Sequence, residues 1–405
     1  MGGRTESPAR TRRTVLDAVV VGAGPVALAT ALGLRQSGHA VVLLVDQPPS
    51  PFAVANDVDL RVYALAPDVL DLLDRLGVLA GIRAIRACAY RSMQVWDAGS
   101  SARLHFAAAE YGWPELGLIV EHALLVDQLW QALGAAGVEV RVNGRERVEW
   151  EPAGADGTWF LPAQGLRTRL LLAADGARSA LRAAAGIHAA EHAYGQDGLV
   201  AHVRFEQPHQ NTAWQRFLPD GTLALLPLAD GRCSIVWSLP EAAAQRRRDL
   251  PAAAFLDELG AAAEWRLGRA LELSARRTVP LKRLLAERYV CAPVVLLGDA
   301  AHVAHPLAGQ GLNLGLRDVD LLLRQQARVR AGEVPLDRAL AAWERERRSE
   351  NTLAVRGFEA LDRLFRARGP LATLRGLGVN LVNRFGPAKA LFAQLAAGRL
   401  GRPLG

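Results

Sequence analysis

Cysteine is scarce in this chain of 405 residues, which contains only Cys88, Cys233 and Cys291. Their number is odd, they lie far apart, and none belongs to a CxxC pair. A disulfide framework and a cysteine-ligated metal site both need regularly spaced cysteines, so the sequence predicts neither. Free cysteines are typical of a reducing compartment, and we expect a cytoplasmic protein.

Lysine is rarer still, since Lys282 and Lys389 are the only two among 48 basic residues. The net charge of +7 and the isoelectric point near 9.9 raise the question of nucleic-acid binding. The arginines, however, are scattered among acidic residues, and no stripe of basic and aromatic residues is present. Nucleic-acid-binding proteins cluster their positive charge, so the sequence predicts no nucleic-acid partner.

Long apolar runs are also missing from the sequence. No segment approaches the roughly 18 to 20 uncharged apolar residues of a membrane-spanning helix. Residues 1–16 are polar and basic, lack the apolar core of a signal peptide, and are expected to form a loose tail. The chain as a whole is nevertheless 50% apolar, and at this length it is predicted to form two domains.

Residues 17–47 have the pattern of a β-α-β unit. The apolar runs 18–21 and 41–45 predict strands that are buried on both faces of a parallel sheet. Between them, residues 25 to about 37 predict a helix that ends before a C-capping glycine.

A glycine motif joins the first strand to this helix. Gly22, Gly24 and Ala27 occupy the positions of G-x-G-x-x-G/A. Gly22 allows the tight turn, Gly24 lets a pyrophosphate approach the backbone, and Ala27 permits close packing of helix and strand. The helix N-terminus offers N–H groups to the phosphates, and Asp46 ends the second strand, where it can bind a ribose diol. The unit predicts dinucleotide binding but does not separate NAD from FAD.

A second candidate cofactor-binding segment follows much later, in GDAAHVAHPLAGQGLNLG at residues 298–315. It is called here the second cradle, and the glycine motif after the first strand is the first. The run 294–297 predicts another buried strand, Asp299 follows its end, and a long helix is expected over 311–330. A flat flavin must be held at both its adenine and its isoalloxazine ends, whereas NAD enzymes do not need a second cradle so far along the chain. We therefore expect FAD.

With these residues in view, the sequence resembles the group A FAD-dependent aromatic monooxygenases and, within them, the ubiquinone-biosynthesis hydroxylases. The resemblance covers nearly the whole chain, and the order and spacing of its motifs are more specific than any one of them. Besides residues 298–315, it rests on DLRVYALAP (59–67), MQVWD (93–97), LGLIVEHALL (116–125), LLAADGARSALR (171–182), TAWQRFLPDGTLALLPL (212–228) and WERERRSEN (343–351).

The resemblance implies an α/β fold of the p-hydroxybenzoate hydroxylase type. A Rossmann-like FAD-binding domain would be interleaved with an antiparallel β-sheet substrate domain and followed by C-terminal helices. The implied ranges are 17–75, 115–187 and 285–345 for the FAD-binding domain, 76–114 and 188–284 for the substrate domain, and 346–405 for the helical region.

The resemblance also implies roles for individual residues. Asp299 would hydrogen-bond the ribityl chain, Pro306 would wall the isoalloxazine ring, and Arg61 would reach the phosphate or adenosine side of FAD. Asp175 and Gly176 would serve both FAD and the transient docking of NAD(P)H. The helix N-terminus would face the pyrimidine edge of the flavin through Gly309, Gln310, Gly311, Leu312 and Asn313.

Several of these residues have a structural alternative. His302 and His305 are candidates for a catalytic acid or base because histidine titrates near neutrality, yet both lie in a loop that glycine and proline shape. Arg178 and Arg182 are candidate phosphate contacts. Asp175 is alternatively part of a strand-ending turn in which Ser179 caps the next helix.

The substrate domain carries weaker signals. Segments 199–206, 213–219 and 222–238 are predicted to form antiparallel strands, with turns at Asp220-Gly221 and Asp230-Gly231. Such a sheet could lie over the flavin and line an apolar pocket with Trp214, Phe217, Leu225, Leu226 and Trp237, although strand aromatics more often belong to the core.

The C-terminal region offers two interpretations. Residues 353–398 are predicted to be helical and partly amphipathic, with interspersed arginines. Such a region can rest on an anionic membrane surface that holds a prenylated substrate. An ordinary helical cap on the fold is the alternative.

These observations together predict an FAD-dependent, NAD(P)H-using hydroxylase of a hydrophobic aromatic substrate in ubiquinone biosynthesis. In the family that it resembles, reduced FAD takes up O2 to form a C4a-hydroperoxide, which transfers oxygen to the ring. A flavin reductase of prenyl groups and a noncatalytic FAD-holding scaffold of a biosynthetic complex are the alternatives. Ala27 in place of the third glycine and His122 in place of the asparagine usual after Glu121 are departures that leave the exact substrate open.

Overall fold

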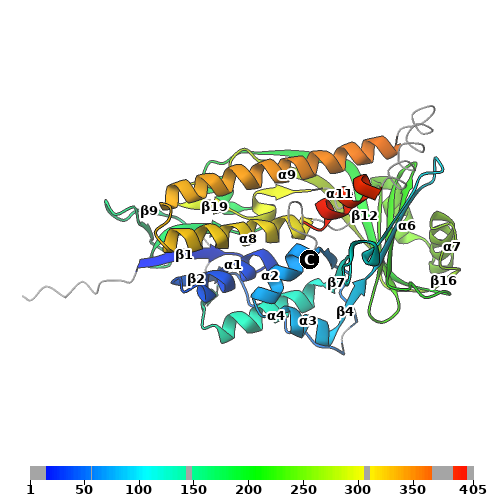
Figure 1. Ribbon diagram of the computed structural model, residues 1–405, viewed down its shortest axis with the longest axis horizontal. Helices are drawn as coiled ribbons and strands as arrows, with labels where there is room; N and C mark the ends of the chain where they lie inside the picture. The colour runs from blue at the N-terminus through cyan, green and yellow to red at the C-terminus, as the bar shows by residue number, and fades with distance from the viewer. Residues whose placement is uncertain (1–14, 56, 143–147, 305–310, 367–385, 399–405) are drawn as a thin grey trace, which may run out of the picture.

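The structure is a computed structural model that describes residues 15–55, 57–142, 148–304, 311–366 and 386–398. It confirms the predicted α/β class, because a mostly parallel sheet and a larger, mostly antiparallel sheet lie side by side along the molecule (Figure 1). The predicted tail, residues 1–16, lies outside the described residues except for its last two, since the first strand begins at Val15.

Parallel strands form the centre of the first sheet, in the order β19-β11-β1-β2-β8. The apolar runs of β2 and β19 are buried without alternation, as expected for strands covered on both faces, whereas the edge strand β8 is partly exposed. Their bounds are Val15–Val21 (β1), Val41–Val45 (β2), Glu139–Val142 (β8), Leu166–Ala173 (β11) and Val294–Leu296 (β19). Antiparallel edges are added by β9 (Glu151–Pro152), β10 (Trp159–Leu161) and β18 (Val290–Cys291).

Both helices that the glycine motifs predict are present beside this sheet. Helix α1 (Pro25–Gln36) packs against α8 (Gly311–Arg330) and α4 (His122–Ala135). Gly33 makes the first of these contacts possible, because a Cβ atom there would lie 2.4 Å from Cδ1 of Leu323. The remaining helices of this half are α2 (Pro67–Arg75), α3 (Leu79–Ile85), α5 (Ala180–Ala184), and the 3-10 turns η1 (Ala108–Tyr111) and η2 (Gly298–Ala300).

The second sheet has the order β20-β17-β12-β15-β14-β13-β5-β6, with β16 paired to β12. It contains the predicted antiparallel strands, and α6 (Glu241–Asp249) and α7 (Ala252–Ala262) lie on its far side from the first sheet (Figure 1). The strand bounds are Ser92–Asp97 (β5), Arg103–Ala107 (β6), Ala189–Phe205 (β12), Thr212–Leu218 (β13), Gly221–Pro227 (β14), Cys233–Pro240 (β15), Ala270–Leu273 (β16), Arg277–Ala286 (β17) and His302–Val303 (β20).

A small third sheet, β3-β7-β4, lies where the two large sheets meet. Its strands are Val62–Leu65 (β3), Ala87–Tyr90 (β4) and Gly117–Glu121 (β7). Ala64 and Ile119 of this sheet share an apolar cluster with Ala213 and Leu226 of the second sheet. The third sheet therefore joins the two halves.

Helix α9 (Leu336–Arg366) runs along much of the molecule and crosses the predicted domain boundary between residues 345 and 346 without interruption (Figure 1). Helix α11 (Gly386–Ala396) follows it in the described chain. None of the helices in the described ranges is both long and apolar enough to cross a bilayer.

Candidate functional site

The turn after β1 requires glycine. Gly22 has a φ of +141°, and a Cβ atom there would lie 2.2 Å from the carbonyl oxygen of Ala174 and 3.1 Å from Cβ of Ala27. The Gly22 N–H donates to the carbonyl of Leu44 at 3.0 Å. Close packing of three elements therefore sets the identities of Gly22 and Ala27, as the sequence predicted.

The N-terminus of α1 is open. Gly24 is its N-cap, no side chain caps it, and its first turn carries no acidic residue. A Cβ atom on Gly24 would have nothing within 4 Å. The first N–H groups of a helix have no partners within the helix, so this end fits a phosphate that approaches closely, as the pyrophosphate of FAD would.

Asp46 and Arg61, the two residues predicted to contact the adenosine side of FAD, are both solvent-exposed. Asp46 is exposed directly after the end of β2, and Arg61 is exposed with its guanidinium 5.4 Å from the centre of the Tyr63 ring. Asp46 is accessible after the carboxyl end of β2, and Arg61 is accessible directly before β3. Both remain predicted cofactor contacts.

A tyrosine that the sequence did not single out lies beside Arg61. The Tyr63 hydroxyl and His122 Nδ1 are 2.9 Å apart. Burial lowers the pKa of His122, and the positive charge of Arg61 lowers it further. Glu121 points elsewhere, since it forms an ion pair with Arg86 and accepts from the Asp59 N–H. The departure at position 122 thus places an imidazole with a lowered pKa next to the predicted cofactor arginine.

The loop after β11 has both of the features that its two interpretations require. Gly176 has a φ of +86° and open space at its Cβ position, which suits a close ligand. Ser179 caps α5 by accepting from the Arg182 N–H at 2.9 Å, so the capping interpretation is confirmed. Asp175 accepts from the Leu181 N–H at 3.3 Å and so braces the same turn.

Arg182 is not placed as a phosphate contact. Its side chain is buried and donates to the carbonyl oxygens of Ala300 and Ala177, both at 2.9 Å. Because its guanidinium is committed to backbone, the phosphate assignment is corrected to a structural one. Arg182 ties the loop after β11 to η2, while Arg178 remains exposed.

Asp299 lies in the η2 turn, close after the end of β19. Its residue surface is accessible to solvent, yet desolvation by the surrounding protein raises the pKa of its carboxyl against the opposing charges of His302 and Arg61. A carboxyl that is exposed yet desolvated has protein atoms around much of it while one side stays reachable, and this accessible position is called here the Asp299 recess. This position fits a carboxylate that a ribityl hydroxyl group would cover.

The two predicted cradles meet at one point. A Cβ atom on Gly298 would lie 3.1 Å from Cγ2 of Val26, and one on Gly315 would lie 2.9 Å from the same atom. Val26 belongs to the first turn of α1, whereas Gly315 belongs to the first turns of α8. Small residues thus allow α1, η2 and α8 to converge, which brings together motifs almost 300 residues apart.

His302 lies in a buried polar centre rather than in the recess. The His302 side chain has 1% of its surface exposed, and its Nε2 lies 2.6 Å from Oδ2 of Asp318. The same Oδ2 accepts from the Gly298 N–H at 3.0 Å. The geometry favours the structural alternative for His302, because its proton-exchanging nitrogen is held by a carboxylate and the ring has almost no access to a substrate.

Helix α9 completes this centre. Arg347 donates from Nε to Oδ1 of Asp318 at 2.7 Å, and Asn351 donates to the same oxygen at 3.2 Å. Asp318 therefore accepts four hydrogen bonds while fully buried. Although burial opposes ionisation, His302 and Arg347 hold the pKa of Asp318 well below its ordinary value. The charge of Asp318 fixes the backbone that precedes Asp299.

The start of α8 combines an open end with a clamp. Gly311 begins the helix with open space at its Cβ position, and Leu312 is half-buried. Asn313 is fully buried, accepts from the Ala66 N–H at 2.9 Å and donates to the Ala64 carbonyl at 2.8 Å. Its amide thus holds the end of β3, and the cofactor contact expected at this helix N-terminus stays a prediction.

The remaining predicted residues of this loop, His305, Pro306, Gly309 and Gln310, lie outside the described residues. In the described chain, no three His, Cys, Asp or Glu side chains are grouped in a way that would hold a metal ion.

The five candidate pocket residues of the second sheet divide between its two faces. Leu225 and Trp237 belong to the apolar cluster beneath α7, and Trp214 packs against that cluster. Leu226 instead packs on the small third sheet, and Phe217 stacks on Phe365 of α9 with ring centres 3.7 Å apart. The core interpretation therefore holds for the three residues on the α7 side, which lie on the face away from the FAD-binding half.

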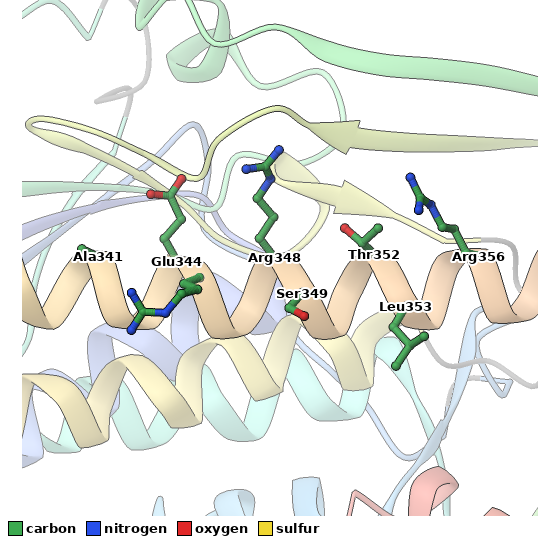
Figure 2. A pocket seen from close by; sticks show the side chains of 8 residues that line it. Ala341, Glu344, Arg348, Ser349, Thr352, Leu353 and Arg356 are labelled. Carbon is green, nitrogen blue, oxygen red and sulfur yellow. The ribbon is translucent and has the colours of Figure 1, made fainter.

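A shallow pocket lies elsewhere, on the surface of α9 (Figure 2). Arg348 and Arg356 project from the same side of the helix as Thr352, while Leu353 projects from the other side of the pocket. Glu344, at its rim, accepts from the N–H groups of Tyr289 and Val290, so it caps β18. The pocket is separate from the Asp299 recess.

Comparisons with known proteins agree with this geometry. The model of the FAD binding domain family matches residues 15–357. The chain is 34% identical to the 3-demethoxyubiquinol 3-hydroxylase of Escherichia coli, covering 94% of this chain and 98% of that one. It is 36% identical to the ubiquinone hydroxylase UbiL of Rhodospirillum rubrum, covering 95% and 90%.

Solved structures show the same fold at lower identity. PqsL of Pseudomonas aeruginosa, in complex with 2-aminobenzoylacetate, matches with a TM-score of 0.73 and 22% identity, covering 91% of this chain and 100% of that one. The p-nitrophenol 4-monooxygenase PnpA of Pseudomonas putida matches with a TM-score of 0.72 and 19% identity, covering 96% and 99%.

Proposed function

Since this chain belongs to the FAD binding domain family of FAD-dependent monooxygenases, we propose that it hydroxylates the aromatic ring of a prenylated phenol in ubiquinone biosynthesis. The observation that carries the proposal is the convergence of α1, η2 and α8 at Val26, beside the turn that holds Asp299. The names of the two hydroxylases described above support the ubiquinone precursor as substrate.

The residues divide the work of holding the cofactor. The open N-terminus of α1 would bind the pyrophosphate, Asp46 the ribose diol and Asp299 the ribityl chain. The N-terminus of α8, which begins at Gly311, would point its positive dipole end at the flavin edge that gains negative charge on reduction. When bound, FAD supplies the electron transfer from NAD(P)H and the activation of O2.

The protein would position the cofactor and exclude water from the reacting groups. The buried Asp318 centre holds the backbone next to Asp299, so the cofactor would meet a preformed recess rather than a mobile loop. The apolar rows of the second sheet would exclude water from the reacting ring, which limits the wasteful release of hydrogen peroxide.

Purification tests this proposal directly. We expect a yellow protein whose NAD(P)H oxidation is stimulated by a polyprenylphenol, with label from 18O2 in the product. A protein that remains colourless in excess FAD contradicts cofactor binding. Reduction of a double bond without O2 consumption supports the alternative reductase, and bound flavin that NAD(P)H never bleaches supports the scaffold.

We further propose that the outer face of α9 rests on the cytoplasmic surface of an anionic membrane. Arg345, Arg348 and Arg356 are exposed on it, and none has an ion-pair partner in the described part of the chain. Leu353 is 71% exposed, and Leu361 and Leu364 are also exposed. Unpaired arginines beside exposed leucines suit an anionic interface where a prenylated substrate dissolves.

Vesicle flotation tests this membrane proposal. We expect binding to vesicles that contain phosphatidylglycerol and not to pure phosphatidylcholine, with loss of binding in the R345E/R348E/R356E variant. Arg269→Glu, on an exposed surface far along the chain from α9, is the control and should leave binding unchanged. Equal binding by both variants contradicts a role for α9.

A further inference from the structure

The second sheet offers a distinct set of side chains to each side. Along β13, Trp214 and Leu218 pack toward α7, whereas Ala213 packs on the small third sheet. Since side chains alternate along a strand, Gln215 and Phe217 lie on the same face as Ala213. This face, called here the inner face, is directed toward the FAD-binding half.

Pairing across the strands arranges the inner face in rows. One row, with Ala213, Leu226 and Met93, is covered by the third sheet. Another row contains Phe217, which Phe365 of α9 covers. Between these two covers lies a middle row, of which Val236 packs against the first cluster and Val95 against the second, and both valines stay half-buried.

This middle row is the accessible part of the inner face. It consists, in register, of Val200, Val236, Ala224, Gln215 and Val95. Its three valines are only half-buried, although most lie on central strands of the sheet. Incomplete burial at the centre of the sheet leaves this row partly accessible, and its lining is mainly apolar.

Uncharged polar groups interrupt this apolar lining. Gln215 is 6% exposed, and on the neighbouring row Thr222 is 6% and Ser238 is 4% exposed. Thr222 pairs with Ser238 across the sheet and with Phe217 on its other side, which places it diagonally beside Gln215. In the described part of the chain, none of these three side chains has a hydrogen-bond partner.

Because none of the polar atoms of these three side chains is among the fully buried atoms that lack a partner, these groups face accessible space, where water or a ligand satisfies them. We propose that Gln215, supported by Thr222 and Ser238, hydrogen-bonds an oxygen substituent of the aromatic substrate, while the middle row contacts its ring. The amide both donates and accepts, so it suits a neutral hydroxyl group; a carboxylate is held in proteins by arginine or lysine. This assignment rests on the proposed function and makes Gln215 a specificity-determining residue.

The test compares two probes on the FAD-loaded protein, 2-prenylphenol and prenylbenzene, which differ by one hydroxyl group. Binding is measured from the change in the flavin absorbance spectrum. Wild type is expected to prefer the phenol, and Gln215→Met is expected to bind the phenol about tenfold more weakly while binding prenylbenzene at least as well. Gln94→Met is the matched control, because Gln94 lies on the opposite face of β5 from Val95.

Three results separate the possibilities. An unchanged preference for the phenol in Gln215→Met overturns this assignment alone. Failure of wild type to bind either probe overturns the proposed substrate class and this assignment with it. The free protein gives an independent readout, since replacing an amide that has no protein partner should not lower its melting temperature; a marked decrease shows that Gln215 has a structural partner and also overturns the assignment. Thr222→Val should weaken phenol binding in the same direction.

Discussion

His302 Nε2 lies 2.6 Å from Asp318 Oδ2, and this oxygen also accepts the N–H of Gly298, the residue before Asp299. The pair therefore acts on the backbone of the predicted cofactor loop and not on a substrate. Arg347 supplies the compensating charge from α9. Such a centre stabilises the fold only while every member is present.

Asp318→Asn tests this centre. We expect it to lower the free energy of unfolding by about 3 to 5 kcal/mol, because the variant leaves a buried arginine without its counter-charge. Flavin affinity should fall as well, since the Gly298 backbone loses its fixed acceptor. Denaturant titration and flavin titration measure the two effects. Asp320→Asn, on the same helix but paired with Arg75 and Arg324 near the surface, should cost less than about 1 kcal/mol.

Gly22 and Gly24 make a matched pair that separates folding from cofactor binding. Gly22→Ala is expected to destabilise the free protein by about 1 to 3 kcal/mol, because it combines a positive φ with a backbone clash. Gly24→Val should leave the free protein unchanged yet weaken FAD binding about tenfold or more, since its side chain would occupy the phosphate position. Equal flavin affinity of Gly24→Val and wild type contradicts the phosphate assignment.

Asp299→Ala should yield a folded but largely colourless protein. Desolvation opposes the charge of this carboxyl in the free protein, so its loss should not lower the melting temperature. Flavin absorbance after purification and circular dichroism together check the prediction. Asp257→Ala, exposed on α7, is the control. Full flavin absorbance in Asp299→Ala means that the ribityl contact lies elsewhere.

His202 should give the protein an acid-sensitive stability. Burial lowers the pKa of His202 from 6.5 to about 4, so the folded state holds a neutral ring while the unfolded state gains a proton near pH 6.5. Stability is therefore expected to fall as the pH drops from 6.5 toward 4, by about 3 kcal/mol in total. Denaturation of His202→Phe should lack this part of the pH dependence.

Exposed histidine provides the comparison for that experiment. His188→Gln should keep the wild-type slope, because its residue is solvent-exposed in the folded protein as well. If His202→Phe and wild type lose stability in parallel between pH 6.5 and 4, another group is responsible.

The cofactor side of the site was predictable because its requirements are local. Gly22 needs a turn at a strand end, and Asp299 follows a buried strand, so short segments reveal both. Asp318 depends on Arg347 and Asn351, which come 29 and 33 residues later on another helix. One signal was present: Arg347 and Asn351 continue a stripe in steps of four between Trp343 and Val355, and all four residues are at most 2% exposed.

The substrate side was less predictable because both faces of the second sheet are buried. The run Leu223 to Leu226 contains no polar residue that would mark one face. Alternation between apolar and polar residues identifies a face only when one side meets water. The assignment of Trp237 and Leu226 to opposite faces therefore depended on α7 and the third sheet, which are distant in sequence.

The dependence of Asp318 on α9 also sets an order for biogenesis. A nascent chain that has emerged only as far as α8 already possesses the glycine turn and the carboxylate, but not Arg347 or Asn351. Until Arg347 and Asn351 are in place, the Asp318 carboxylate that accepts from the Gly298 N–H lacks their hydrogen bonds and the charge of Arg347. Capture of the flavin is therefore expected to be a late event, completed only after translation has passed residue 351.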